Sequence, residues 1–295
     1  MFKHNAHLIM KRIVLFLLTN ILIVFTLNIL ISVLGIGHYM TAQGISYPDL
    51  AAFCLVWGMT GSFISLALSK VSAKWMMKIQ VVEKSSPDLG WLVSMIEQLS
   101  RKAGLPVTPE IGIYESPEVN AFATGPSKRR SLVAFSTGLL QSMDRNEIEG
   151  VAGHEIAHIA NGDMVTMTLL QGVVNAFVMF FARIAAWAIS QNVREESRHS
   201  VQFMTTMVLE IMLGILGMLV ICAFSRHREF RADKGGAEYA GKYDMIAALK
   251  RLSMNKQRFD KEPALATLKI AGGVGQFFAT HPPLEARIKA LQAAQ

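Results

Sequence analysis

Long apolar runs alternate with polar stretches along the chain, and the runs predict membrane-spanning helices. Four of them reach the roughly 20 apolar residues that cross a bilayer: 13–36, 50–70, 164–190 and 201–224. The first run is longer than the apolar core of a signal peptide and has no clear cleavage site after it, so we expect it to be retained. The pattern predicts a mainly α-helical membrane protein with four transmembrane helices.

Two charged residues interrupt the later runs, Arg183 in the third and Glu210 in the fourth. Charges inside a membrane usually face protein or water and often pair. On antiparallel helices these two lie at similar depths, so one interpretation is an ion pair. The other is that Arg183 reaches the far membrane surface by itself.

Composition and charge agree with a membrane setting. Of the 295 residues 17% are charged, whereas soluble domains carry about 25%. The formal charge of +7 comes mostly from basic residues beside the apolar runs, and no nucleic-acid-binding motif accompanies it. The positive-inside rule then places both termini and the polar stretches 75–162 and 225–295 in the cytoplasm. Cys54 and Cys222 lie inside apolar runs, where neither a disulfide nor a metal site is expected.

A short helix with clear start and stop signals is predicted before the third run. Asp144 and Glu147 form a capping box at its start, with Met143 and Ile148 placed as a hydrophobic staple. Asn161-Gly162 supplies a C-terminal stop. We therefore expect one helix from Arg145 to Ala160.

This helix carries the pattern H-E-I-A-H at residues 154–158. Residues four apart share a helix face, so His154 and His158 can hold one zinc ion while Glu155 reaches the water bound to it. Catalytic zinc usually has a third protein ligand. The polar segment after the fourth run offers three candidates, and we favour Glu229 as the ligand. Asp233, one turn later, would orient a ligand histidine. His227 lies off that face, and the alternative for the whole segment is a solvated charged turn.

The motif pair H-E-I-A-H and E-F-R-A-D resembles the HtpX family of membrane-integral zinc metalloproteases, which shares a superfamily with the CAAX prenyl proteases. Similar segments start at Met10 (M-K-R-I-V-L-F-L-L-T-N), Asn120 (N-A-F-A-T-G) and Thr280 (T-H-P-P), whereas residues 1–9 and 271–275 depart from the family pattern. The resemblance implies a cytoplasmic α+β protease domain of the zincin (gluzincin) type. It implies that one zinc ion is bound and that Glu155 is catalytic, the zinc ligands being His154, His158 and Glu229.

Three short runs ahead of the zinc helix predict a small antiparallel sheet: 110–114, 119–123 and 131–135. If the middle strand is an exposed edge, a substrate peptide can add to it. We expect substrate contacts from Asn120, Ala121 and Phe122. The alternative is that Asn120 only satisfies its own chain.

His281 precedes two prolines that fit the first turn of a helix ending near Leu291. A histidine at a helix start is usually structural. Here the alternative is a hydrogen bond from His281 to the oxyanion of the reaction. The glycines of 271–275 predict a loop, and they lack the lysine of a phosphate-binding loop.

These residues predict a membrane-embedded zinc metalloendopeptidase with its site in the cytoplasm and Glu155 as general base, which could reach unfolded polypeptides and the cytoplasmic regions of membrane proteins. The resemblance implies a bacterial inner membrane, misfolded or damaged membrane proteins as substrates, and a stress role. The partners of the protein are the bilayer and these substrates, not nucleic acid. The alternatives are a CAAX-type processing protease, a membrane scaffold with a structural zinc site, and a zinc transporter. Structural zinc sites usually have four Cys or His ligands, and a transporter would place ligands inside the apolar runs.

Overall fold

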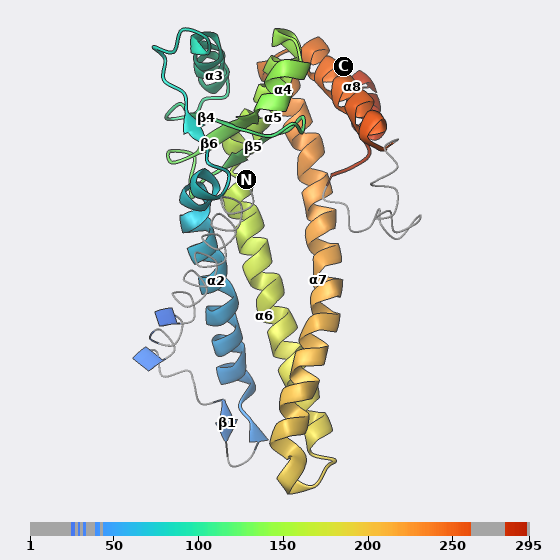
Figure 1. Cartoon of the computed structure of the whole chain (residues 1–295). Helices are drawn as coiled ribbons and strands as arrows, with labels where there is room; N and C mark the ends of the chain where they lie inside the picture. Colours follow the sequence, from blue (N-terminus) through green and yellow to red (C-terminus); the bar gives the residue numbers. More distant parts are fainter. Residues whose placement is uncertain are drawn as a thin grey trace, which may run out of the picture. The chain divides into compact units, whose positions relative to one another are not determined.

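The computed structural model describes residues 39–41, 44–260 and 281–293, with five isolated positions before residue 39. Its helices and strands are shown in Figure 1. The helices are α2 (Tyr47–Met76), α3 (Gly90–Lys102), α4 (Thr137–Ser142), α5 (Arg145–Asn161), α6 (Asp163–Ser190), α7 (Glu195–Tyr239), α8 (Lys242–Asp260) and α10 (Leu284–Ala293). The strands are β1 (Met40–Thr41), β2 (Gly44–Ile45), β3 (Gln80–Val81), β4 (Glu110–Tyr114), β5 (Ala121–Thr124) and β6 (Leu132–Ser136).

The chain forms two compact units. One contains the described residues up to Ser65 together with Thr168–Val220, and the other contains Leu66–Met167 together with the described residues from Ile221 onwards. Helices α2, α6 and α7 are long and apolar enough to cross a membrane. They contain the predicted spans 50–70, 164–190 and 201–224. The remaining predicted span, 13–36, lies outside the described residues except for isolated positions.

The first unit packs its long helices closely side by side (Figure 1). Gly58 of α2 meets the backbone of α6: a Cβ atom there would lie 2.7 Å from the carbonyl oxygen of Gly172 and 2.8 Å from the amide nitrogen of Ala176. The charged residues of α6 and α7 pair, because Arg183 Nη1 lies 2.5 Å from Glu210 Oε1. Of the two interpretations of Arg183, the ion pair is therefore the correct one.

The second unit contains a four-stranded sheet in the order β3-β4-β6-β5. The predicted antiparallel sheet is only partly correct, because β4 and β6 pair in parallel, with Glu110 opposite Leu132. After β4 the chain passes to the far edge, forms β5 there, and returns through a hairpin to place β6 between the two. That return gives β6 the direction of β4, which the positions of the strands along the sequence do not reveal.

One face of this sheet covers the helix that was predicted to bind zinc. Val133 and Phe135 of β6 pack with Ile148, Ile156 and other apolar residues of α5 in one core. At the other side of the sheet, Glu110 accepts hydrogen bonds from two lysines of α2, Lys70 and Lys74, which attach the end of that helix to β4. The sheet thus holds α5 in a fixed position within the second unit.

Helix α7 differs most from the prediction, since it continues fifteen residues beyond the expected end of the fourth span at 224. The segment after 224 is rich in Arg, Glu and Ala, which all favour helix. Its carboxylates are buried against α5 rather than solvated, with Glu229 0% and Asp233 1% exposed. The same unbroken helix therefore contains an apolar stretch and two candidate site residues.

Candidate metal centre

Helix α5 presents His154 and His158 on one buried face. It begins at the predicted capping box, in which Asp144 accepts from the Glu147 amide and Glu147 accepts from the Asp144 amide. It ends at Gly162, whose φ of 72° is left-handed. The Nε2 atoms of the two histidines lie 3.1 Å apart. The helix starts at the predicted residue and ends one residue later than predicted. Its two histidines share one face, as the spacing predicts.

Glu229 of α7 completes a cluster with these two histidines. Its Oε2 lies 3.4 Å from His154 Nε2 and its Oε1 lies 3.3 Å from His158 Nε2. Close packing of the helices brings it there, since a Cβ on Gly236 would lie 3.0 Å from the backbone nitrogen of His154. One ligand atom from each of the three residues can be chosen so that all lie within 4.8 Å of one another.

This cluster fits a tetrahedral zinc ion. With zinc bonds of about 2.0–2.1 Å, two ligands of a tetrahedral ion lie about 3.3–3.4 Å apart, close to the observed 3.1–3.4 Å. Within the described residues, Glu229 Oε1 is buried and accepts no hydrogen bond. A buried carboxylate oxygen normally has a partner, and a cation would provide one. Two imidazoles and a carboxylate are the donor set that zinc hydrolases use.

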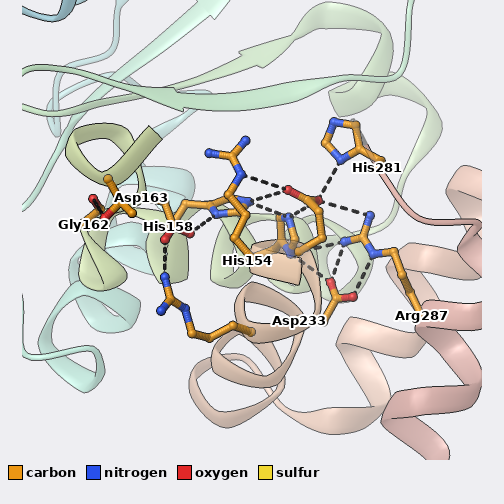
Figure 2. A network of polar contacts seen from close by, with 11 residues as sticks. His154, His158, Gly162, Asp163, Asp233, His281 and Arg287 are labelled. Atoms are coloured by element: carbon orange, nitrogen blue, oxygen red, sulfur yellow. Dashed lines mark hydrogen bonds and ion pairs between the residues drawn. The ribbon is translucent and has the colours of Figure 1, made fainter. Parts of the chain in front are cut away.

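Two aspartates contact the imidazole rings (Figure 2). Asp233 Oδ1 lies 2.9 Å from His154 Nδ1, and Asp163 Oδ2 lies 2.7 Å from His158 Nδ1. A carboxylate accepts, so each Nδ1 carries the proton and each Nε2 keeps its lone pair for a metal. Asp233 therefore contacts His154, one of the two histidines that were predicted to bind zinc.

The electrostatics of the cluster favour positive charge at its centre. Burial by itself lowers the pKa of His158, but hydrogen bonds to Asp163 and Glu229 outweigh it and raise that pKa to about 9. Burial likewise raises the pKa of Glu229, but the neighbouring imidazoles of His154, His158 and His281 outweigh it and lower that pKa far below its usual range. Sites that stabilise protonated imidazoles next to an ionised carboxylate also stabilise a metal ion that replaces those protons.

Glu155 follows the first ligand directly on α5 and is buried, with 9% of its surface exposed. Within the part of the chain that the structure describes, its side chain makes no hydrogen bond or ion pair. Both properties suit a general base, because the Glu155 carboxylate is shielded from solvent and has no other hydrogen-bond partner that would compete with a water molecule.

Two residues near the C-terminus reach the same cluster. His281 Nδ1 donates to Glu229 Oε2 at 2.7 Å, and its side chain is 61% exposed. Arg287 of α10 is buried and forms two hydrogen bonds to Asp233, with Nε–Oδ2 at 2.7 Å and Nη2–Oδ1 at 2.5 Å (Figure 2). The predicted helix after the two prolines therefore brings a histidine and an arginine to the site.

The predicted substrate strand is an edge strand. In the described sheet β5 pairs only with β6. The backbone of Asn120 is held by Ser136, whose amide donates to the Asn120 carbonyl at 2.9 Å and whose hydroxyl accepts from the Asn120 amide at 3.1 Å. Lys128 in the following hairpin turn donates to the carbonyl of Ala160 at 2.5 Å, which attaches this edge to the end of α5.

The sequence interpretation did not identify Asp163 and Arg287, which contact residues at the cluster. The available signal for Asp163 was Gly162, because a left-handed glycine turns the chain back and brings the next side chain to the helix end. Nothing in the sequence indicated a role for Arg287 except its position six residues after His281.

Comparisons with known proteins agree with this geometry. A family model described as peptidase family M48 matches residues 87–295. Proteins described as protease HtpX homologs from Bacillus licheniformis and Bacillus subtilis are 54% and 53% identical to this chain, over 96% of it and 99% of each relative. The crystal structure of Ste24p from S. mikatae is similar in fold, with a TM-score of 0.63 at 19% identity. That match covers 95% of this chain and 66% of the Ste24p chain, so this chain spans just under two thirds of the Ste24p length.

Proposed function

The chain belongs to peptidase family M48 and to the HtpX proteases, and from that premise we propose that it is a zinc-dependent endopeptidase of a bacterial inner membrane. Its substrates in this proposal are the cytoplasmic regions of misfolded or damaged membrane proteins. The observation that carries the proposal is the buried cluster of His154, His158 and Glu229, next to the buried carboxylate of Glu155.

The two histidines would hold one zinc ion through their Nε2 atoms, and Glu229 would hold it through its carboxylate. Zinc in this place would supply a Lewis acid that polarises a peptide carbonyl and lowers the pKa of a water from about 16 towards about 7. Asp233 keeps the Nδ1 proton of His154 in place. The proton transfers and the hydrogen bond to the carbonyl oxygen are supplied by side chains of this protein.

Glu155 acts as the general base. Its carboxylate accepts a proton from the water that attacks the peptide carbonyl and then delivers it to the nitrogen of the leaving amine. Protonation lets that nitrogen depart as a neutral amine. His281 donates a hydrogen bond to the carbonyl oxygen as negative charge develops on it. Both roles need side chains close to the cluster, and the contacts of His281 and the position of Glu155 support them.

The free edge of β5 receives the substrate as an added strand, and the contacts come from residues 120–122. An edge strand binds any extended peptide through main-chain hydrogen bonds. This suits a protease that acts on unfolded chains of varied sequence. Helix α6, which is long and apolar enough to cross a membrane, starts only five residues after His158. That short separation supports substrates located at a membrane.

The decisive experiment replaces Glu155 by Gln in the full-length protein, purified in detergent or lipid. We expect proteolysis of casein and of the protein itself to fall at least about 100-fold, the contribution typical of a positioned acid–base group. Zinc content, measured by elemental analysis, should stay at one per chain. Glu149→Gln on the same helix is the matched control and should keep full activity. Normal activity of Glu155→Gln would refute the assignment of the base.

The same proteins distinguish the substrate classes. A misfolded membrane protein should be cleaved by the wild type and not by Glu155→Gln. A prenylated peptide should be a poor substrate for both. Preferential cleavage of the prenylated peptide would instead indicate a processing protease of the CAAX type.

A further inference from the structure

Asp163 is buried next to a ligand histidine and has no part in the mechanism described above. Only 1% of its surface is exposed. Its Oδ2 lies 2.7 Å from His158 Nδ1, and its Oδ1 lies 2.5 Å from Arg231 Nη2. Each oxygen therefore has one strong partner, a ligand histidine on one side and a guanidinium on the other.

The placement of Asp163 depends on the turn between α5 and α6. In an uninterrupted helix a residue five positions after His158 would lie about 140° around the axis, away from the imidazole. Gly162 ends α5 with a φ of 72°, and Asp163 starts α6. The left-handed glycine is what turns the carboxylate back towards His158, as Figure 2 shows for Gly162, Asp163 and His158.

Arg231 connects this carboxylate to α7, the helix of the third ligand. It lies two residues after Glu229, and its side chain is 53% exposed. The other histidine has a matching arrangement, in which Arg287 binds Asp233 and Asp233 binds His154. Each histidine therefore contacts an aspartate that is bound by an arginine. The two arginines differ in exposure, because Arg287 is buried and Arg231 is half-exposed.

We propose that Asp163 is a positioning residue for His158 and that Arg231 acts through Asp163 by holding its carboxylate. The proposal rests on the zinc site proposed above. An acceptor at Nδ1 fixes the tautomer and the ring plane, leaves Nε2 free for the metal and makes that nitrogen more basic. Loss of such a partner typically weakens metal binding about 10- to 100-fold.

The test measures zinc affinity of the full-length protein by competition with a chelator of known affinity. Asp163→Ala should weaken zinc binding about 10- to 100-fold. Asp163→Asn should lose less, because its amide oxygen can still accept from Nδ1. Arg231→Gln should weaken binding by a smaller factor, since Asp163 remains and this ion pair is partly exposed. Combining Arg231→Gln with Asp163→Ala should add nothing to the loss of Asp163→Ala alone.

A control and a spectrum separate positioning from a general loss of structure. Arg251→Gln removes another arginine–carboxylate pair of α5, the one between Arg251 Nε and Glu147 Oε2 at 3.0 Å. It should leave zinc affinity unchanged. The visible absorption of the cobalt(II)-substituted protein reports on ligand geometry, and it should shift in Asp163→Ala but not in Arg251→Gln.

The outcomes distinguish this proposal from the proposed function. If the wild type binds no zinc, the proposed function fails and the positioning role fails with it. If the wild type binds zinc and Asp163→Ala binds it equally well, with an unchanged cobalt spectrum, only the positioning role is overturned. If Arg231→Gln weakens binding as much in the Asp163→Ala protein as in the wild type, Arg231 does not act through Asp163.

Discussion

The imidazole of His281 has two nitrogens, and the structure gives a partner to only one of them. Nδ1 donates to the Glu229 carboxylate. Nε2 has no partner among the described residues, and more than half of the side chain is exposed. Through the first contact His281 holds Glu229, the proposed third ligand. The second role, a hydrogen bond from Nε2 to the oxyanion, requires the doubly protonated imidazole, because only that form donates from both nitrogens.

We expect His281→Ala to lower kcat about 100-fold, the usual effect of removing one oxyanion donor, while KM and zinc content change little. His227→Ala is the matched control, because His227 is an exposed histidine of the same region that lies outside the cluster. Steady-state kinetics on a fluorogenic peptide and zinc analysis measure both variants. A fall in zinc affinity with normal kcat in the zinc-saturated variant would leave His281 only the role of holding Glu229.

Individual residues also show what a sequence can predict. The ends of α5 were predictable because Asp144, Glu147 and Gly162 determine them through contacts a few residues apart. Asp163 and Arg287 were not, because their partners lie in other elements: Arg231 is 68 residues from Asp163, and Arg287 is 54 residues from Asp233. Short-range signals report the local chain, whereas the groups that orient the ligands depend on helix packing.

At the scale of elements, strand β5 pairs with β6 on one side and, among the described residues, with no strand on the other. Asn120 and Ser136 face each other as a bonded pair, and antiparallel pairs alternate between bonded and non-bonded positions. The amide of Ala121 therefore points away from β6, towards the free edge. A proline is tolerated at such an edge position, because it removes an amide that the sheet does not use.

We expect Ala121→Pro to raise KM for peptide substrates at least about 10-fold, through loss of one main-chain hydrogen bond and blocking of the edge. Its thermal unfolding temperature should stay near that of the wild type. Ala121→Ser keeps the amide and should keep the wild-type KM. Equal KM values for the Pro and Ser variants would mean that substrate does not pair with β5.

Two features of the elements were not predicted from the sequence: the order of the strands in the sheet and the length of α7. Three strands were placed correctly along the sequence, but pairing in a sheet depends on which strand is inserted between the others. For α7, the change from apolar to charged residues after 224 suggested an end. A change in polarity does not by itself end a helix, and α7 continues through Arg, Glu and Ala residues that favour helix to Tyr239.

For the whole molecule, the apolar surface of the long helices determines the environment in which the protein folds. In α7 only 11% of the most apolar 18-residue window is buried. Its exposed side chains include Phe203, Ile211 and Leu216. An apolar surface of this extent would cause association in water, whereas lipid solvates it. The direction in which the helices cross the membrane is a separate question, and the distribution of basic residues predicts it.

Thiol labelling in cells tests the predicted orientation. The native Cys54 and Cys222 are 1% and 2% exposed, so background labelling should be low. Asn192→Cys lies in the exposed connection between α6 and α7, and Tyr243→Cys lies in α8, where Tyr243 is 88% exposed. A membrane-impermeant maleimide should label Asn192→Cys in cells whose inner membrane is intact and should label Tyr243→Cys only after that membrane is permeabilised. The reverse pattern would place the catalytic cluster outside the cytoplasm. Labelling of both from one side would show that α6 and α7 do not form a membrane-crossing hairpin.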